Sequence, residues 1–205
     1  MIRRKFRYAA RHHYAAQAAL NIDALKTANA HRWSVVKPLR DFSAVAKRLA
    51  DPTAKARYQA VEKTTGVPWF FIAVVHEREA SQDWNTQLGQ GDPLNRVSIH
   101  DPKGEGPFKT WEAGAIVALH DYPYADRNKD WTVGPFLTML EQYNGLGYFD
   151  RGIPSPYVWS GTDQYHSGKF IRDDVFSAHT VDVQDGCAGL LLAMMKIDPS
   201  VKFAS

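Results

Sequence analysis

Residues 67–80 read VPWFFIAVVHEREA, an apolar run that ends in charged residues. The run has no polar face, which is typical of an element buried on every side. A buried strand is the competing interpretation of so short a run. We favour a helix, because Pro68 suits a first helical turn and residues 76–80 continue the run with helix-forming residues. The stretch predicts a buried central helix with Glu77 and Glu79 at its polar end.

The rest of the chain predicts a mostly α-helical fold around this helix. Asp51 and Pro52 are typical of a helix start, and Gly66 of the end of that helix. Thr110 begins another helix, and two more are expected near residues 135–143 and 183–196. Residues 87–107 and 147–169 predict long loops, the first with a possible small β-ribbon near residues 96–100.

Charge divides the chain unevenly. Residues 1–48 hold eleven Lys or Arg against Asp23 and Asp41 alone, whereas the remainder carries a balance of −6. We therefore separate a basic helical N-terminal segment, residues 1–50, from a main domain, residues 51–205. A basic segment fits an anionic cell-wall or membrane surface as its partner, and a solvated helix face is the alternative.

Several classes of protein are excluded by composition. The longest apolar run is about half of what a bilayer span needs, and no apolar stretch follows the basic first residues as in a Sec signal peptide. Cys187 is the single cysteine, so there is no intrachain disulfide and no cysteine cluster for zinc or iron–sulfur. Zinc-binding histidine motifs and phosphate-binding glycine loops are absent. We expect neither a metal nor a cofactor.

Two carboxylates stand out as candidates for catalysis. Glu79 follows the apolar run, where partial removal from water favours the protonated form that a general acid needs. Asp92 lies in the glycine-rich loop GQGDP at residues 89–93. Two carboxylic acids in unlike surroundings suit cleavage of a glycosidic bond. A glutamate in a salt bridge at a helix end is the alternative.

These segments resemble the catalytic region of goose-type lysozymes, in which an apolar helix ends in Arg-Glu-Ser and a Gly-x-Gly-Asp loop follows at the same distance. Here Ala80 replaces that serine, and Ser81 comes next. The segment at residues 143–145, Tyr-Asn-Gly, resembles one shared with soluble lytic transglycosylases. The chain also resembles a bacterial and phage group of lysozyme-like cell-wall hydrolases through HERE, GDPL, YNG and SPYVWSG, over roughly residues 60–195.

The resemblance implies a lysozyme-like N-acetylmuramidase that cleaves peptidoglycan, the MurNAc–GlcNAc polymer, without a cofactor. Glu79 would protonate the leaving oxygen, and Asp92 would orient water or stabilise the positive charge that develops on the sugar. The wide placement expected for a loop carboxylate predicts hydrolysis with inversion. Without an export signal, the protein is expected to be an endolysin, encoded by a phage or prophage, that stays in the cytoplasm until it is released to the wall.

The choice of glutamate has an alternative. Glu77 and Glu79 point about 200° apart on a helix, so only one can face a given cleft. His76-Glu77 resembles the His-Glu-Thr of plant-type chitinases, but only Glu79 has the goose-type spacing to Asp92. We assign Glu79 as the acid and expect Glu77 to support His76 or an arginine. Asp83 is the alternative second carboxylate.

Aromatic residues in the second loop suit sugar binding, because pyranose rings pack on aromatic faces. Core packing is the alternative for each. The predicted substrate-binding set is Tyr143, Asn144, Tyr148, Tyr157, Trp159 and Tyr165.

Rival functions are a lytic transglycosylase, a chitinase, and a non-enzymatic module that binds glycan or nucleic acid. Nucleic acid is not expected, because few basic residues lie among these aromatic residues.

Overall fold

The computed structural model describes residues 17–89, 91–100, 103–121, 123–172 and 174–205. Residues 1–16 of the predicted basic segment lie outside this description. The described residues form eight α-helices, two short 3-10 helices and a two-stranded sheet. The helices are α1 (Gln17–Val35), α2 (Ser43–Leu49), α3 (Pro52–Thr65), α4 (Trp69–Ala80), α5 (Trp111–His120), α6 (Val133–Asn144), α7 (Pro156–Trp159) and α8 (Cys187–Ile197), with η1 (Ala125–Arg127) and η2 (Phe149–Arg151). The mostly α-helical prediction is confirmed.

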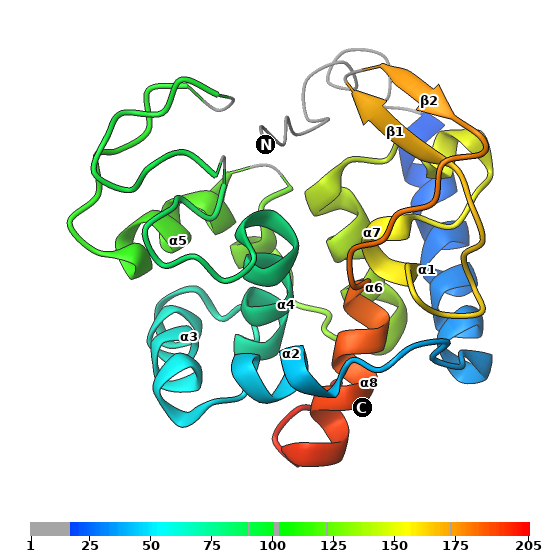
Figure 1. Cartoon of the computed structure of the whole chain (residues 1–205), viewed down its shortest axis with the longest axis horizontal. Helices are drawn as coiled ribbons and strands as arrows, with labels where there is room; N and C mark the ends of the chain where they lie inside the picture. The colour runs from blue at the N-terminus through cyan, green and yellow to red at the C-terminus, as the bar shows by residue number, and fades with distance from the viewer. Residues whose placement is uncertain (1–16, 90, 101–102, 122, 173) are drawn as a thin grey trace.

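Helix α4 is the buried centre of the fold. Its residues from Trp69 to Val75 are each 5% exposed or less. It packs against α2, α3, α6 and α8, and Figure 1 shows it between α3 and α5 on one side and α6 and α8 on the other. The predicted buried helix is therefore confirmed, and the competing strand interpretation is wrong.

The helix before α4 begins and ends where its sequence predicts. The carboxylate of Asp51 accepts hydrogen bonds from the backbone N–H groups of Thr53 (3.0 Å) and Ala54 (3.4 Å), which caps α3. Gly66 ends the helix in the left-handed conformation, with φ of 73°. These two ends fix the short connection from which α4 starts.

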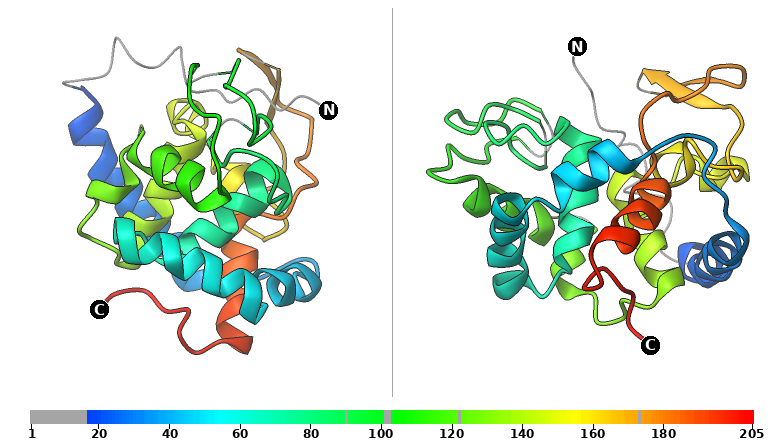
Figure 2. Two further views of the ribbon diagram at one scale, coloured as in Figure 1. Left: turned by 90° about the vertical axis from the view of Figure 1, so that its left-hand side faces the viewer. Right: turned by 60° about the horizontal axis from the view of Figure 1, so that its bottom comes forward.

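Helix α1 packs along α6 (Figures 1 and 2). Leu25 and Asn29 are buried, and Asn29 Nδ2 donates to Thr138 Oγ1 over 3.3 Å. The backbones approach so closely that a Cβ at Gly134 would lie 2.6 Å from the carbonyl oxygen of Lys26. The described part of the predicted N-terminal segment therefore contributes to the core.

The two-stranded sheet lies at a different position in the chain from the predicted ribbon. Strands β1 (Lys169–Arg172) and β2 (Val175–Ser177) pair antiparallel, with Phe170 opposite Phe176. The ribbon predicted near residues 96–100 is wrong, since none of these residues is in a strand. The physical reason is that the backbone N–H groups of Ile99 and His100 donate to the side chain of Asp92. They are therefore not available to pair with a neighbouring strand.

The long loop between α4 and α5 and the β1–β2 hairpin lie at the same end of the molecule (Figure 2). None of the described helices is both long enough and apolar enough to span a membrane.

Candidate active site

Glu79 lies half-buried in the last turn of α4, and α7 supplies its hydrogen-bond donor. The hydroxyl of Tyr157 donates to Glu79 Oε1 over 3.1 Å. The Tyr157 side chain is buried, and burial together with the Glu79 charge raises the pKa of Tyr157 well above its usual value. The hydroxyl therefore keeps its proton and remains a donor to the carboxylate.

A buried ion pair fixes the neighbouring residue of α4. Arg78 Nη2 donates to Asp182 Oδ2 over 2.9 Å, and both side chains are 5% exposed or less. Lys169 Nζ lies 2.7 Å from the other oxygen of Asp182. Burial alone would raise the pKa of Asp182, but the two cations outweigh it and lower the pKa. The arginine carbon Cζ also lies 4.9 Å from the Tyr157 ring centroid, so this pair supports the donor to Glu79.

Glu77 faces the other side of α4. Its Oε2 accepts a hydrogen bond from Arg48 Nη2 of α2 over 2.8 Å, as expected of an acid that supports an arginine. Glu77 thus contacts α2 while Glu79 contacts α7, which separates the two candidates as their helical spacing predicts.

His76 belongs to a buried hydrogen-bond chain. Its Nε2 faces the carbonyl oxygen of Asp83 (3.1 Å) and must donate, so its Nδ1 accepts from the hydroxyl of Tyr58 (3.0 Å). Burial lowers the pKa of His76 to about 4, so the ring is neutral near pH 7. The amide of Gln82 donates to the same Tyr58 hydroxyl and accepts from Arg48. This chain supports the turn after Glu79.

That turn has an uncommon backbone. Ser81 and Gln82 have φ of 53° and 59°, a left-handed conformation that non-glycine residues rarely adopt. Such conformations persist where surrounding contacts hold them, and they are enriched at functional sites. Here the turn directs the chain into the loop that carries Asp83 and Asp92.

Asp92 lies in a loop that passes against the end of α4. A Cβ at Gly91 would lie 4.0 Å from the carbonyl oxygen of Glu79. The buried Asp92 carboxylate accepts from the backbone N–H groups of Ile99 (2.9 Å) and His100 (3.1 Å), and from His100 Nδ1 (2.6 Å). Burial alone would raise the pKa of Asp92. Together these hydrogen bonds outweigh burial, so the pKa lies below its usual value. Asp92 is therefore ionised, and both of its oxygens are engaged.

Asp83, the alternative second carboxylate, is exposed. Its Oδ1 accepts from the backbone and the side-chain amide of Asn85. It closes the turn that leads into the loop.

The predicted sugar-binding residues are mostly buried. Tyr143 and Trp159 are 0% exposed, and Asn144 is half-buried. The buried hydroxyl of Tyr148 accepts from the backbone of Phe170, and that of Tyr165 bonds to the backbone of Gly168. These aromatic rings pack in the core and form no exposed surface on which a sugar could stack. Contact of these residues with sugar stays a prediction. The structure brings one of the set, Tyr157, to Glu79.

The sequence did not predict the Arg78–Asp182 pair, the Tyr157 hydrogen bond or the role of His100 in the loop. Arg78 and Asp182 are 104 residues apart, and no motif surrounds either Asp182 or His100. The arginine at position 78, shortly after the apolar run of α4, is the one indication that a buried partner was needed.

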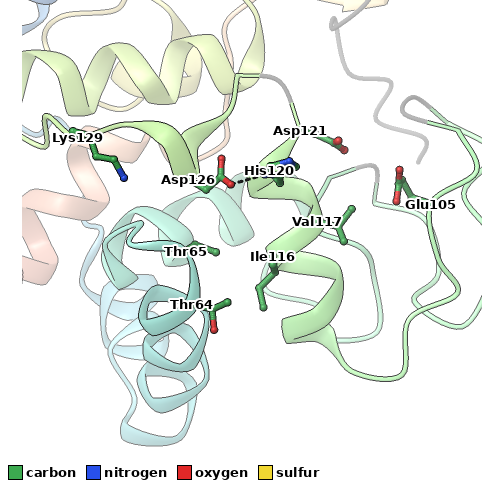
Figure 3. A pocket seen from close by; sticks show the side chains of 9 residues that line it. All are labelled: Thr64, Thr65, Glu105, Ile116, Val117, His120, Asp121, Asp126 and Lys129. Carbon is green, nitrogen blue, oxygen red and sulfur yellow. Dashed lines mark hydrogen bonds and ion pairs between the residues drawn. The ribbon is translucent and has the colours of Figure 1, made fainter.

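No group of three or more His, Cys, Asp or Glu side chains placed to hold a metal occurs among the described residues. A cavity of about 580 Å³ opens between the end of α3, α5 and η1, and none of the predicted site residues lines it. His120 donates there to Asp126 over 2.6 Å (Figure 3).

The comparisons with known proteins found no match. No protein-family model, no curated protein and no solved structure matches this chain. The function of the residues around Glu79 must therefore be inferred from their chemistry. They comprise a carboxyl group with a fixed hydrogen-bond donor and a neighbouring loop that holds an ionised aspartate and a histidine.

Proposed function

We propose that this protein is a lysozyme-like N-acetylmuramidase that hydrolyses the glycan strands of peptidoglycan. One observation carries the proposal: Glu79 lies in the last turn of a buried helix and receives a hydrogen bond from a buried tyrosine, and its backbone carbonyl oxygen lies against Gly91, the residue before Asp92. Glycosidic cleavage requires a positioned carboxylic acid and a second acidic group, the two roles that we assign to Glu79 and the Asp92 loop.

In this mechanism Glu79 protonates the oxygen between MurNAc and GlcNAc. The carboxylate left behind is stabilised by the Tyr157 hydroxyl, because hydrogen bonds to an ionised acceptor are about twice as strong as neutral ones. In this mechanism the loop that carries Asp92 lies on the side of the sugar from which water attacks. The step needs no cofactor.

The basic N-terminal segment would concentrate the enzyme on an anionic cell wall or membrane surface. An endolysin of a phage or prophage, held in the cytoplasm until release to the wall, is the biological role that we infer from the resemblance.

The test is the action of the purified protein on peptidoglycan. We expect loss of turbidity of a wall suspension and one new reducing end for each bond cleaved. Products ending in 1,6-anhydro sugars would instead indicate a lytic transglycosylase. Cleavage of chitin in preference to peptidoglycan would indicate a chitinase. Absence of all three activities would refute the proposal.

A further inference from the structure

Asp92 and His100 form a close pair in the loop between α4 and α5. His100 Nδ1 lies 2.6 Å from Asp92 Oδ1, while Asp92 Oδ2 accepts two backbone N–H groups. The Asp92 side chain is 8% exposed and that of His100 is 34% exposed. The carboxylate is therefore occupied by the loop, and the imidazole is the member of the pair that reaches solvent.

The hydrogen bond fixes the tautomer of the neutral ring. An ionised carboxylate only accepts, so the proton lies on His100 Nδ1 and the lone pair on Nε2. Among the described residues Nε2 has no hydrogen-bond partner. The ring consequently presents a proton acceptor to water.

The loop that carries this acceptor passes against the last turn of α4, which carries Glu79. The loop backbone at Gly91 lies against the Glu79 carbonyl oxygen, Asp92 is the next residue, and His100 is bonded to it. The imidazole is therefore held by the segment of the loop that lies next to the end of α4.

We propose that His100, oriented by Asp92, is the general base that activates water in the glycosidic hydrolysis catalysed by Glu79. The inference rests on the proposed function and replaces a direct role of Asp92 with an indirect one. Nε2 takes a proton from water as the water oxygen bonds to the anomeric carbon. The glycosidic bond breaks as Glu79 gives its proton to the leaving oxygen. The imidazolium, stabilised by Asp92, then returns its proton through solvent to the Glu79 carboxylate.

Two variants isolate the pair. In His100→Asn, the side-chain amide can replace Nδ1 as the donor to Asp92, but nothing replaces Nε2. In Asp92→Asn, the amide oxygen can accept the two backbone N–H groups, so the NH₂ faces the ring and forces the proton onto Nε2. Both changes remove the base while keeping the loop bonded. Losing a general base typically lowers turnover by about 10²- to 10⁴-fold.

A second histidine–aspartate pair gives a matched control. His120 Nδ1 lies 2.6 Å from Asp126 Oδ2, the same separation, but this pair joins α5 to η1 and lines the cavity of Figure 3. His120→Asn should keep wild-type turnover.

The experiment measures release of reducing ends from purified peptidoglycan, with circular dichroism to show that each variant is folded. We expect His100→Asn and Asp92→Asn each to lose about 10²-fold or more in kcat, and the double variant to lose no more than His100→Asn alone. Added imidazole should restore part of the activity of His100→Ala, because a free base can enter the space of the lost ring.

Each contrary result separates this inference from the proposed function. Wild-type turnover in folded His100→Asn, with Asp92→Asn inactive, would show that Asp92 acts directly and overturn the inference. Additive losses in the double variant, or no rescue by imidazole, would also overturn it. A wild-type protein that releases no reducing ends would instead refute the muramidase proposal.

Discussion

The hydroxyl of Tyr157 lies 3.1 Å from the Glu79 carboxylate, and the two residues are 78 positions apart in the chain. The donor comes from the buried face of α7, where Arg78 of α4 packs over its ring. The bond therefore depends on contacts between side chains of α4 and α7 that are far apart in the sequence. It would stabilise the charged form that Glu79 takes after it has given up its proton.

Tyr157→Phe should lower kcat by about 10- to 100-fold, because hydrogen bonds to charged groups contribute about 1.5–3 kcal/mol. Thr138→Val is the control, since it removes the buried hydrogen bond from Asn29 on the α1–α6 contact without touching Glu79. We expect a lower Tm but an unchanged kcat for this control. Equal turnover in Tyr157→Phe and wild type would contradict a role for the hydroxyl in catalysis.

Glu79→Gln should reduce wall lysis by about 10²-fold or more, because the amide keeps the shape of the side chain but has no proton to give. Glu77→Gln should retain lysis and lose about 1 kcal/mol or less of stability, since its partner Arg48 is 44% exposed. Turbidity assays on both variants distinguish the two glutamates. The chitinase-like assignment would be correct if Glu77→Gln were inactive and Glu79→Gln active.

Asp182→Asn should destabilise the fold by about 3 kcal/mol at pH 7, because it leaves the buried charge of Arg78 without its counterion. The pKa of Asp182 is lowered in the folded state, so its contribution is present above the unfolded value of 3.8 and is lost as the pH falls through the folded value. The difference in unfolding free energy from wild type should thus shrink in acid below pH 4. Urea titrations across this range measure it.

An exposed pair gives the comparison for Asp182. Asp23 and Lys26 lie 2.9 Å apart, with side chains 81% and 40% exposed. Asp23→Asn should change stability by about 0.5 kcal/mol or less. A loss in Asp182→Asn as small as this would show that the buried pair is not a major contribution to stability.

The sequence predicted the local features of this fold better than its long-range contacts. The ends of α3 and the burial of α4 follow from neighbouring residues: a capping aspartate, a terminal glycine and an unbroken apolar run. The opposite directions of Glu77 and Glu79 follow from helical geometry alone.

The contacts that complete the candidate site join distant segments. Nothing near Asp182 indicates that it pairs with Arg78, and the aromatic richness of residues 147–169 is compatible with either a sugar platform or a core. The ribbon was misplaced because the bonds from Asp92 to residues 99 and 100 depend on a side chain, which β-propensity does not describe.

Glu141 gives a pH-dependent prediction on α6. Its side chain is 1% exposed and faces Asn29, Arg32 and Trp159, and burial raises its pKa to about 7. Ionisation is therefore easier in the unfolded chain, so stability is lost as the pH rises from the unfolded value of 4.5 to about 7. Glu141→Gln should match wild type in Tm near pH 4.5 and exceed it at pH 8. A Tm difference that is the same at both pH values would argue against this account.

Truncation separates the basic charge of the N-terminal segment from its packing. Deleting residues 1–16 removes five Lys or Arg and no acidic residue, so lysis should weaken most at low salt, where surface charges are least screened. Activity on short soluble glycans should persist. Deleting residues 1–34 also removes the buried Leu25 and Asn29 from the α1–α6 contact, and we expect a lower Tm and loss of activity on both substrates. If the deletion of residues 1–34 keeps the wild-type Tm, α1 contributes little to the core. If the deletion of residues 1–16 shows the same salt dependence of lysis as the full chain, the segment does not bind the wall through its charge.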